Sequence, residues 1–436
     1  MKLKNDPAYI ILGGFGSIIL LGFILLSLPV MRAGNTEYSI ISALFTSISA
    51  VCVTGLTVVD IGQYYSIYGQ IVILGLIQIG GLGYMTVATI IFLLVGKRLS
   101  IRDKLAAQSR IGQFSMHNLV SFILYIIKAT IIIELLGALI LSFAWYDTLG
   151  NQSFYYGLFH SVSAFCNAGF TLFPDNLASF GSNNIVILCL AMLIISGGIG
   201  FIVIKDIFGS DKKFTFHTKI VLKVTAILII IPTILFFIFE YSNPDTIGSM
   251  SLLQKFVVSF FHSVTSRTAG FNIVNMRLCD SANLFMIIML MFIGASPAGT
   301  GGGVKTTTIA VLIASIKSLL KGNDDAVIGN KRIDHAVVQK TWIIIYFSLV
   351  LIALIVFLML FFEKRIFLNV FFEVVSAFGT VGLSTGITSS LSVANKVLIM
   401  ITMFVGRLGP LTIGTALYFR QGIVRIRYPE DKILIG

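Results

Sequence analysis

The chain alternates long apolar segments with short polar ones, and the apolar segments have the length of membrane spans. A helix needs about 20 mostly apolar residues to cross a bilayer, and the first segment, Tyr9–Val30, exceeds that length. It lacks a small-residue cleavage site and further spans follow it, so we do not expect a removed signal peptide. Eight spans are predicted, at Tyr9–Val30, Gly69–Val95, Leu119–Trp145, Asn184–Phe208, Lys219–Phe239, Ala282–Leu320, Val338–Phe362 and Ala394–Arg420.

Four further apolar segments lie between the spans and are too short to cross a bilayer. They run over Tyr38–Ala50, Tyr155–Phe165, Leu252–Thr265 and Phe367–Phe378. Each belongs to or leads into a recurring stretch, which reads FTSISAVCVTG, FHSVSAFCNAG, FHSVTSRTAG and FEVVSAFGTVG, ending at Gly55, Gly169, Gly270 and Gly382. A pattern that recurs along a chain determines its architecture. We therefore interpret the four segments as pore helices.

The recurrence predicts four tandem repeats, each made of a spanning helix, a pore helix and a second spanning helix. The expected boundaries are 1–110, 111–213, 214–330 and 331–436. Each repeat enters and leaves on the same side, so the repeats are parallel and surround an axis normal to the membrane. Non-helical backbone at membrane depth is tolerated where it is buried in protein or lines water. Four loops meeting on the axis satisfy that condition, which predicts an all-α membrane protein around a central pore.

The distribution of basic residues predicts the orientation in the membrane. The formal charge is +12, and 21 of the 31 Lys and Arg residues fall on one side when the loops are assigned alternately. Positive loops stay in the cytoplasm, so both termini are expected to be cytoplasmic in a multi-pass plasma-membrane protein. This asymmetry explains the charge without a nucleic-acid partner. Convergent carboxylate, His or Cys groups are not visible, so we expect neither an enzyme nor a cofactor in this chain.

The glycine stretches carry the candidate chemistry. A dehydrated cation needs oxygen dipoles in place of its water shell, and rings of backbone carbonyls supply them. Glycine adopts positive φ, which lets successive carbonyls point the same way, and the negative ends of the pore helices favour a cation at the centre. The predicted selectivity filter, with K+ at its carbonyls, comprises Val53, Thr54, Gly55, Asn167, Ala168, Gly169, Thr268, Ala269, Gly270, Thr380, Val381 and Gly382. Glycines that merely turn the chain are the alternative.

The second span of the third repeat contains a breakable segment, 294–304. It resembles a phosphate-binding loop, but Val304 stands where that motif needs glycine and apolar helix flanks both sides. We expect a broken helix whose loop plugs the pore below the filter, with a simple kink as the alternative. The candidate gate residues are Ala295, Ser296, Pro297, Ala298, Gly299, Thr300, Gly301, Gly302, Gly303, Lys305 and, from the fourth repeat, Arg407.

Glycine clusters in the second spans predict a shared structural slot. They lie at Gly80–Gly83, Gly197–Gly200, Gly301–Gly303 and Gly406–Gly409. Arg407 takes the place of Gly81 and Gly198, so we expect either an electrostatic barrier below the filter or a structural partner of a carboxylate. Arg267, beside the shortened third filter stretch, is expected behind the filter. Lys128 and Glu134 share one span, and the sequence does not name their partners.

With these features the chain resembles the potassium transporters of the Trk/Ktr/HKT superfamily over essentially its whole length. Within that group it is most similar to the membrane subunits of bacterial Ktr systems, because it starts directly with the first repeat. The resemblance implies K+ uptake, often aided by Na+, and an intramembrane loop that gates. It also implies a homodimer that rests on a cytosolic ring of nucleotide-binding RCK subunits of the KtrA or KtrC type. Gly55 replaces the serine of sodium-preferring members, which favours K+ over the alternative of a Na+-permeable transporter.

Overall fold

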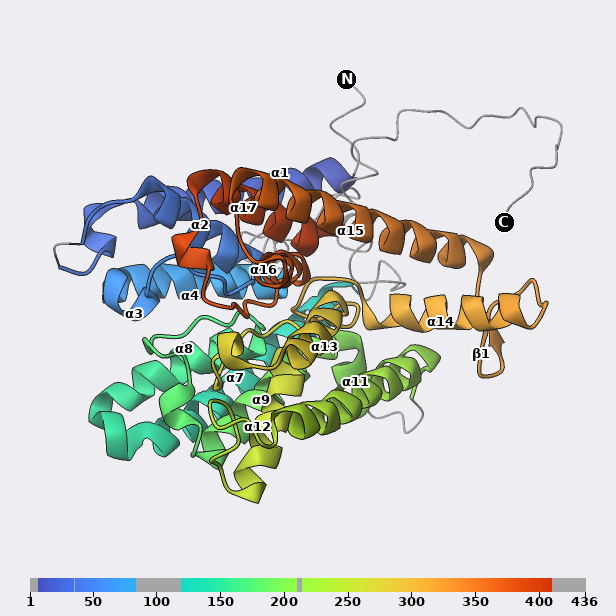
Figure 1. Ribbon diagram of the computed structural model, residues 1–436, viewed down its shortest axis with the longest axis horizontal. Helices are drawn as coiled ribbons and strands as arrows, with labels where there is room; N and C mark the ends of the chain where they lie inside the picture. Colours follow the sequence, from blue (N-terminus) through green and yellow to red (C-terminus); the bar gives the residue numbers. More distant parts are fainter. Residues whose placement is uncertain (1–6, 35, 84–118, 210–213, 410–436) are drawn as a thin grey trace.

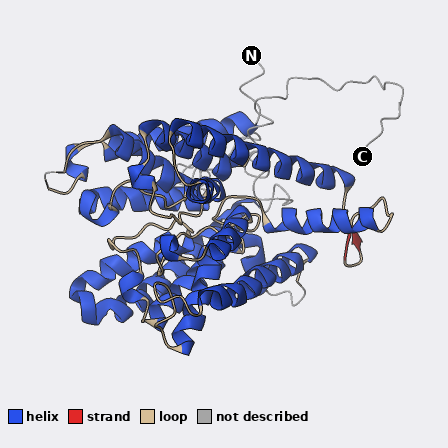
Figure 2. Cartoon of the chain, in the orientation of Figure 1, coloured by secondary structure: helices blue, strands red, loops and turns tan. Residues whose placement is uncertain are grey.

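The computed structural model describes residues 7–34, 36–83, 119–209 and 214–409, and this part of the chain is mostly helical (Figure 2). Its strands form one antiparallel hairpin, β1 (Val327–Ile328) and β2 (Lys331–Arg332). The predicted all-α class is therefore confirmed for the described residues. The expected continuations of the second spans into 84–95 and 410–420 lie outside them, as do the basic ranges 97–110 and 420–432.

The helices follow the predicted order of spanning helix, pore helix and second helix. The first repeat contains α1 (Pro7–Leu26), η2 (Pro29–Met31), α2 (Ile40–Cys52), α3 (Ile61–Tyr64) and α4 (Ile67–Leu82). The second contains α7 (Leu119–Leu149), η3 (Gly150–Gln152), α8 (Ser153–Phe165), η4 (Ala178–Phe180), α9 (Asn184–Gly198) and α10 (Phe201–Phe208). The third contains α11 (Phe216–Glu240), α12 (Leu252–Thr265), η5 (Met276–Leu278), α13 (Ser281–Phe292) and α14 (Thr306–Leu320). After the hairpin, the fourth contains α15 (His335–Phe362), α16 (Phe367–Gly379), η6 (Thr388–Ser390) and α17 (Val393–Leu408).

Four stretches of the described chain are long and apolar enough to cross a membrane. They are Tyr9–Leu26, Val120–Phe165, Phe216–Glu240 and His335–Phe362. Each covers most or all of the first helix of a predicted repeat, and Val120–Phe165 also includes α8. A fifth span results if α9 and α10 are counted together. The expectation of eight continuous spans is therefore not confirmed, because the second helices of the repeats are shorter in the described residues.

The prediction of an unbroken helix over 184–208 is wrong. α9 and α10 meet at an angle of 103°, and Gly200 at the break has a φ of +94°. α4 and α17 end at the matching position, where Gly83 and Gly409 have φ values of +82° and +87°. Glycine adopts positive φ without a steric penalty, so Gly83, Gly200 and Gly409 each stand where a helix ends. The apolar pattern continues past the break, which is why hydropathy alone misses it.

The helices of the four predicted repeats close into a ring around α2, α8, α12 and α16, the predicted pore helices. α4 packs against α8, α9 against α12, α13 against α16, and α17 against α2. The second helix of each repeat thus contacts the next repeat's pore helix, and the last contact joins the chain's end to its beginning, as the red and blue helices show in Figure 1. One phenylalanine at the same place in every pore helix is fully buried: Phe45, Phe159, Phe261 and Phe372. These rings fix the pore helices in the core by close packing.

Candidate ion pathway and gate

The four predicted filter tripeptides meet in one closed ring. A Cβ atom added to any of their glycines would come closer than 3.0 Å to a carbonyl oxygen of the next repeat. The contacts run from Gly55 to Ala168, from Gly169 to Ala269, from Gly270 to Val381, and from Gly382 back to Thr54. Because real Cβ atoms do not approach backbone so closely, the ring admits only glycine at these four places. The structure therefore brings together, at one place in the fold, tripeptides that lie more than a hundred residues apart in sequence.

The backbone of each tripeptide alternates in the sign of φ. The first and third residues have positive φ in all four repeats, and the middle residues do not. The values are 55° at Val53, 86° at Gly55, 57° at Asn167, 68° at Gly169, 112° at Thr268, 77° at Gly270, 52° at Thr380 and 92° at Gly382. Positive φ is rare for β-branched residues and persists where the surroundings enforce it. This alternation allows neighbouring carbonyls to face the same side, which is the geometry that a cation needs.

Hydroxyl groups support the filter from the pore helices. Ser49 and Ser376 accept hydrogen bonds from the backbone N–H groups of Gly55 and Gly382, both at 3.1 Å. At the equivalent positions, Ser163 donates to the carbonyl of Phe170 at 2.8 Å, and Thr265 donates to that of Phe271 at 2.9 Å. Sequence analysis missed these four residues. Their signal was present, because a hydroxyl residue recurs at the same place in every glycine stretch.

In three repeats, one buried polar side chain binds the backbone segment that follows the predicted filter tripeptide. Glu373 accepts hydrogen bonds from the backbone N–H of Thr385 at 3.0 Å, from the Thr388 hydroxyl at 2.9 Å and from the Ser384 hydroxyl. In the second and third repeats, the matching residue is a histidine. His160 Nε2 accepts a hydrogen bond from the backbone N–H of Leu172 at 3.4 Å, and His262 Nε2 accepts one from the N–H of Val274 at 3.3 Å. The two histidines thus have structural partners in the fold.

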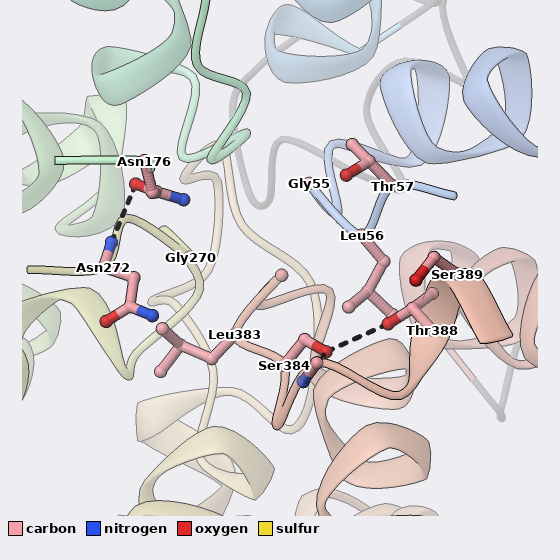
Figure 3. Close-up of a pocket in the computed structure, with 12 residues that line it drawn as sticks. Gly55, Leu56, Thr57, Asn176, Gly270, Asn272, Leu383, Ser384, Thr388 and Ser389 are labelled. Carbon is pink, nitrogen blue, oxygen red and sulfur yellow. Dashed lines mark hydrogen bonds between the residues drawn. The ribbon is translucent and has the colours of Figure 1, made fainter. Parts of the chain in front are cut away.

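The filter opens on one side into polar cavities. A cavity of about 220 Å³ is lined by Gly55, Gly270 and Gly382, and a neighbouring one of about 290 Å³ is lined by Gly55 and Gly169. Figure 3 shows the first cavity, with hydroxyl and amide groups from all four predicted repeats around it. Those groups belong to Thr57, Asn176, Asn272, Ser384, Thr388 and Ser389. Neutral oxygens around an open cavity suit a hydrated cation that approaches the filter.

The loop between α13 and α14 lies against the filter residues. It is closed by the N–H of Gly294, which donates to the carbonyl of Val304 at 2.9 Å. The N–H of Gly302 donates to the Thr380 hydroxyl at 2.9 Å. A Cβ atom on Gly301 would meet the hydroxyl of Thr268. The loop therefore touches the first filter residue of both the third and the fourth repeats.

Further hydrogen bonds tie this loop to α8 and α9 of the second repeat and to α17 of the fourth. Thr300 donates through its hydroxyl to the carbonyl of Phe165 at 3.1 Å, and through its N–H to that of Gly197 at 3.1 Å. The N–H of Gly303 donates to the carbonyl of Gly406 at 3.4 Å. Within the loop, Lys305 Nζ donates to the carbonyl of Gly301 at 2.7 Å. Of the predicted gate residues, Thr300, Gly301 and Gly302 thus make the contacts nearest to the filter and pore helices.

The match of Gly301–Gly303 to the glycine slot of the other repeats is wrong. The first slot glycine follows the N-cap of the second helix by fourteen residues in three repeats, from Ser66 to Gly80, from Asn183 to Gly197 and from Ser392 to Gly406. The same count from Asp280 leads to Gly294. Gly80, Gly197 and Gly406 each face a pore-helix carbonyl, whereas Gly294 faces the carbonyl of Gly302. The three glycines at 301–303 therefore belong to an inserted loop.

Arg407 connects this loop to two repeats. Its side chain is buried, and its guanidinium donates to the carbonyl of Thr300 in the loop and to the carbonyl of Gly80 at the end of α4. Because Arg407 itself belongs to α17, it links the fourth repeat, the loop and the first repeat. The guanidinium stays protonated, so a fixed positive charge lies beside the loop.

Comparison with known proteins shows the family to which the chain belongs. The TrkH family of cation transport proteins matches residues 19–421. The chain belongs to this family. It is 39% identical to Ktr system potassium uptake protein B of Bacillus subtilis (strain 168) over 437 residues, covering 100% of this chain and 98% of the relative. It is 40% identical to the protein of the same name from Vibrio alginolyticus over 440 residues, covering 100% and 96%.

A solved structure shows the same fold. The crystal structure of the potassium transporter TrkH from Vibrio parahaemolyticus matches with a TM-score of 0.71 and 19% identity, over 93% of this chain and 84% of that one. Together with the family match, this confirms the resemblance to the Trk/Ktr/HKT superfamily. The chain is therefore a membrane protein of the TrkH family.

The structure also places the two charged residues whose partners the sequence left open in this TrkH-family chain. Glu134 is buried and accepts a hydrogen bond from Gln78 Nε2 of α4 at 3.2 Å. Its other oxygen lies 3.8 Å from the thiol of Cys166, which precedes the filter residue Asn167. Lys128, on the same helix, is exposed. Glu134 thus belongs to the packing behind the filter, whereas Lys128 lies on the outer face of α7.

Proposed function

We propose that this chain takes up K+ across the cell membrane as the ion-translocating subunit of a Ktr-type system. The observation that carries the proposal is the closed ring of four glycine tripeptides, in which each glycine packs on a carbonyl of the next repeat. The names of relatives at 39% and 40% identity, which are potassium uptake proteins, support K+ as the transported ion.

In this proposal K+ loses its water at the ring. The ion reaches the filter through the cavities lined by hydroxyl and amide groups. Carbonyl oxygens then replace its hydration shell. Each pore helix adds roughly half a negative charge at the C-terminal end that precedes its filter strand, which offsets part of the dehydration cost.

The gate in this proposal is the inserted loop of the third repeat. Its contacts with Thr268, Thr380 and Arg407 support an obstruction directly under the ring. For the ion to leave the ring, the loop must move, which requires breaking its hydrogen bonds to the neighbouring repeats. Its glycine content makes several backbone conformations accessible. Loops that open and close over a site are a common gating device in proteins.

Ion flux into proteoliposomes tests the proposed function. The purified protein is expected to take up K+ and Rb+ in a saturable manner, at a rate at least about tenfold above that of Na+, which corresponds to about 1.4 kcal/mol of discrimination. An inward Na+ gradient is expected to raise K+ uptake. Protein-free liposomes are the control. Equal uptake of K+ and Na+ would instead favour a Na+-permeable transporter.

We also propose that the chain works as a homodimer on a cytosolic ring of nucleotide-binding RCK subunits. The relatives are named as proteins of a Ktr system, which supports a second component. Purification from native membranes in mild detergent is expected to yield a dimer together with a soluble nucleotide-binding protein, and nucleotide is expected to change the flux. A monomer that purifies alone and whose flux ignores nucleotide would refute this.

A further inference from the structure

One buried positive charge next to the filter has no part in the pathway described so far. Counted back from the filter glycines, Arg267 occupies the position of Cys52, Cys166 and Gly379. All four positions are buried, and Arg267 is 8% exposed. Three repeats thus place a small neutral residue directly before the filter, whereas the third repeat places a guanidinium there.

The surroundings of Arg267 do not neutralise this charge. Its side chain borders a cavity of about 10 Å³, room for about one water molecule, whose other walls are Asn167, Val264, the α9 residues Ile194, Ile195 and Gly198, and Ile199, which follows α9. The Nε atom has no hydrogen-bond partner among the described residues. Neither of the ion pairs found among the described residues, Arg332–Asp325 and Arg365–Glu363, includes Arg267.

The cavity of Arg267 is joined directly to the filter. Asn167, which forms part of its wall, is the first filter residue of the second repeat, and its side chain lies 2.9 Å from the hydroxyl of Thr268. Thr268 follows Arg267 in the chain and is the first residue of the third filter tripeptide. Arg267 therefore lies next to the residues that begin two adjacent filter tripeptides, whereas the polar cavities are lined by the glycines that end the tripeptides.

A guanidinium in this position acts on every cation in the ring. It remains protonated, because a guanidinium is a very strong base. At roughly 8 Å and an effective dielectric constant of about 20, a unit charge lowers the occupancy of a monovalent cation by roughly thirtyfold. The repulsion of a divalent cation is twice as large in energy. Carbonyl rings and pore-helix ends alone attract divalent ions more strongly than K+, so a fixed positive charge counteracts that preference.

We propose that Arg267 is a specificity-determining residue that weakens cation binding in the filter and excludes divalent ions. This inference rests on the proposed K+ uptake. The guanidinium of the third repeat would supply a positive charge that the uncharged residues at this position in the other three repeats cannot. The charge is retained although burial of an unpaired cation destabilises a protein, which fits a functional rather than a stabilising role.

Comparing a monovalent with a divalent ion tests the role of the charge, because a purely structural role of Arg267 would affect both ions equally. K+ uptake and its inhibition by Ba2+ are measured in proteoliposomes for Arg267→Gln and Arg267→Met, which remove the charge, and for Arg267→Lys, which keeps it. We expect the half-saturating K+ concentration to fall about thirtyfold and the inhibitory Ba2+ concentration about a thousandfold in the two neutral variants. Arg267→Lys should stay near the original values. Lys128→Gln, which removes an exposed charge from α7, is the matched control and should change neither quantity.

Other outcomes overturn the inference. An equal shift for K+ and Ba2+, or a change in the maximal rate alone, would show that the side chain acts through packing. Loss of folding in both neutral variants, with Arg267→Lys intact, would make the charge structural. If the unaltered protein shows no saturable K+ uptake, the proposed function fails, and this inference fails with it. Saturable K+ uptake with unchanged constants in the neutral variants would refute the role of Arg267 alone.

Discussion

Gly55→Ser is expected to abolish the preference for K+ over Na+. Gly55 has a φ of +86°, and a Cβ atom there would collide with the carbonyl oxygen of Ala168 in the next repeat. The first filter strand or the second must therefore shift, which displaces carbonyls of the ring. Selectivity depends on the number and placement of those oxygens. We expect the K+/Na+ uptake ratio to fall by at least about tenfold, which corresponds to about 1.4 kcal/mol.

A glycine outside the ring provides the matched control for this substitution. Gly75 lies on α4 of the same repeat, where an added Cβ atom meets no atom within 4 Å. Gly75→Ser should therefore leave both uptake and selectivity unchanged. Both variants are compared for thermal stability and for K+ and Na+ uptake in proteoliposomes. A Gly55→Ser protein that folds and keeps the original K+/Na+ ratio would contradict the assignment of the filter.

Arg407→Gln is expected to speed K+ uptake about tenfold. The guanidinium holds the inserted loop through the carbonyl of Thr300 and at the same time places a positive charge beside the ion path. At roughly 8 Å and a dielectric constant of about 20, that charge repels a cation by about 2 kcal/mol. Glutamine removes the charge and weakens the link between the loop and the first repeat, where Gly80 is the other acceptor. Both changes favour flux.

Stability distinguishes a gate residue from a purely structural one. If Arg407 only holds the helices together, Arg407→Gln should lower both the melting temperature and the uptake rate. Arg332→Gln, which breaks an exposed ion pair with Asp325 on the hairpin, is the control and should change neither. A deletion within Ala295–Gly303 is an independent check on the same gate, because it removes the obstruction directly. Unchanged or slower flux in a folded deletion variant would refute the gate.

Several features of the fold could be predicted from local sequence signals. The pore helix Leu252–Thr265 has the same bounds in prediction and structure, because Ser251 and Gln254 form a capping box at its start and the apolar run ends at its last residue. The other pore helices were placed to within about three residues. The order of long and short helices followed from the length of apolar runs, and the filter glycines from their recurrence. Membership of the TrkH family follows from the same repeated pattern.

The hydrophobic pattern overestimated the continuity of the second helices. It reports which side chains avoid water, and both halves of a broken helix avoid water equally. The break at Gly200 depends on a backbone angle that glycine permits but does not require. The slot in the third repeat was misassigned for a similar reason, since Gly294 and Gly301 look alike until the length of α13 is known.

The sequence by itself thus determined the positions of the four short helices and of the glycine tripeptides that follow them, because each of these depends on residues close together in the chain. Only the tertiary structure decided which groups meet. The contact of Gly382 with Thr54, the hydrogen bond from Arg407 to Thr300, and the position of Arg267 beside Asn167 each join residues about a hundred or more positions apart. Such contacts follow from closure of the whole ring, and no local signal encodes them.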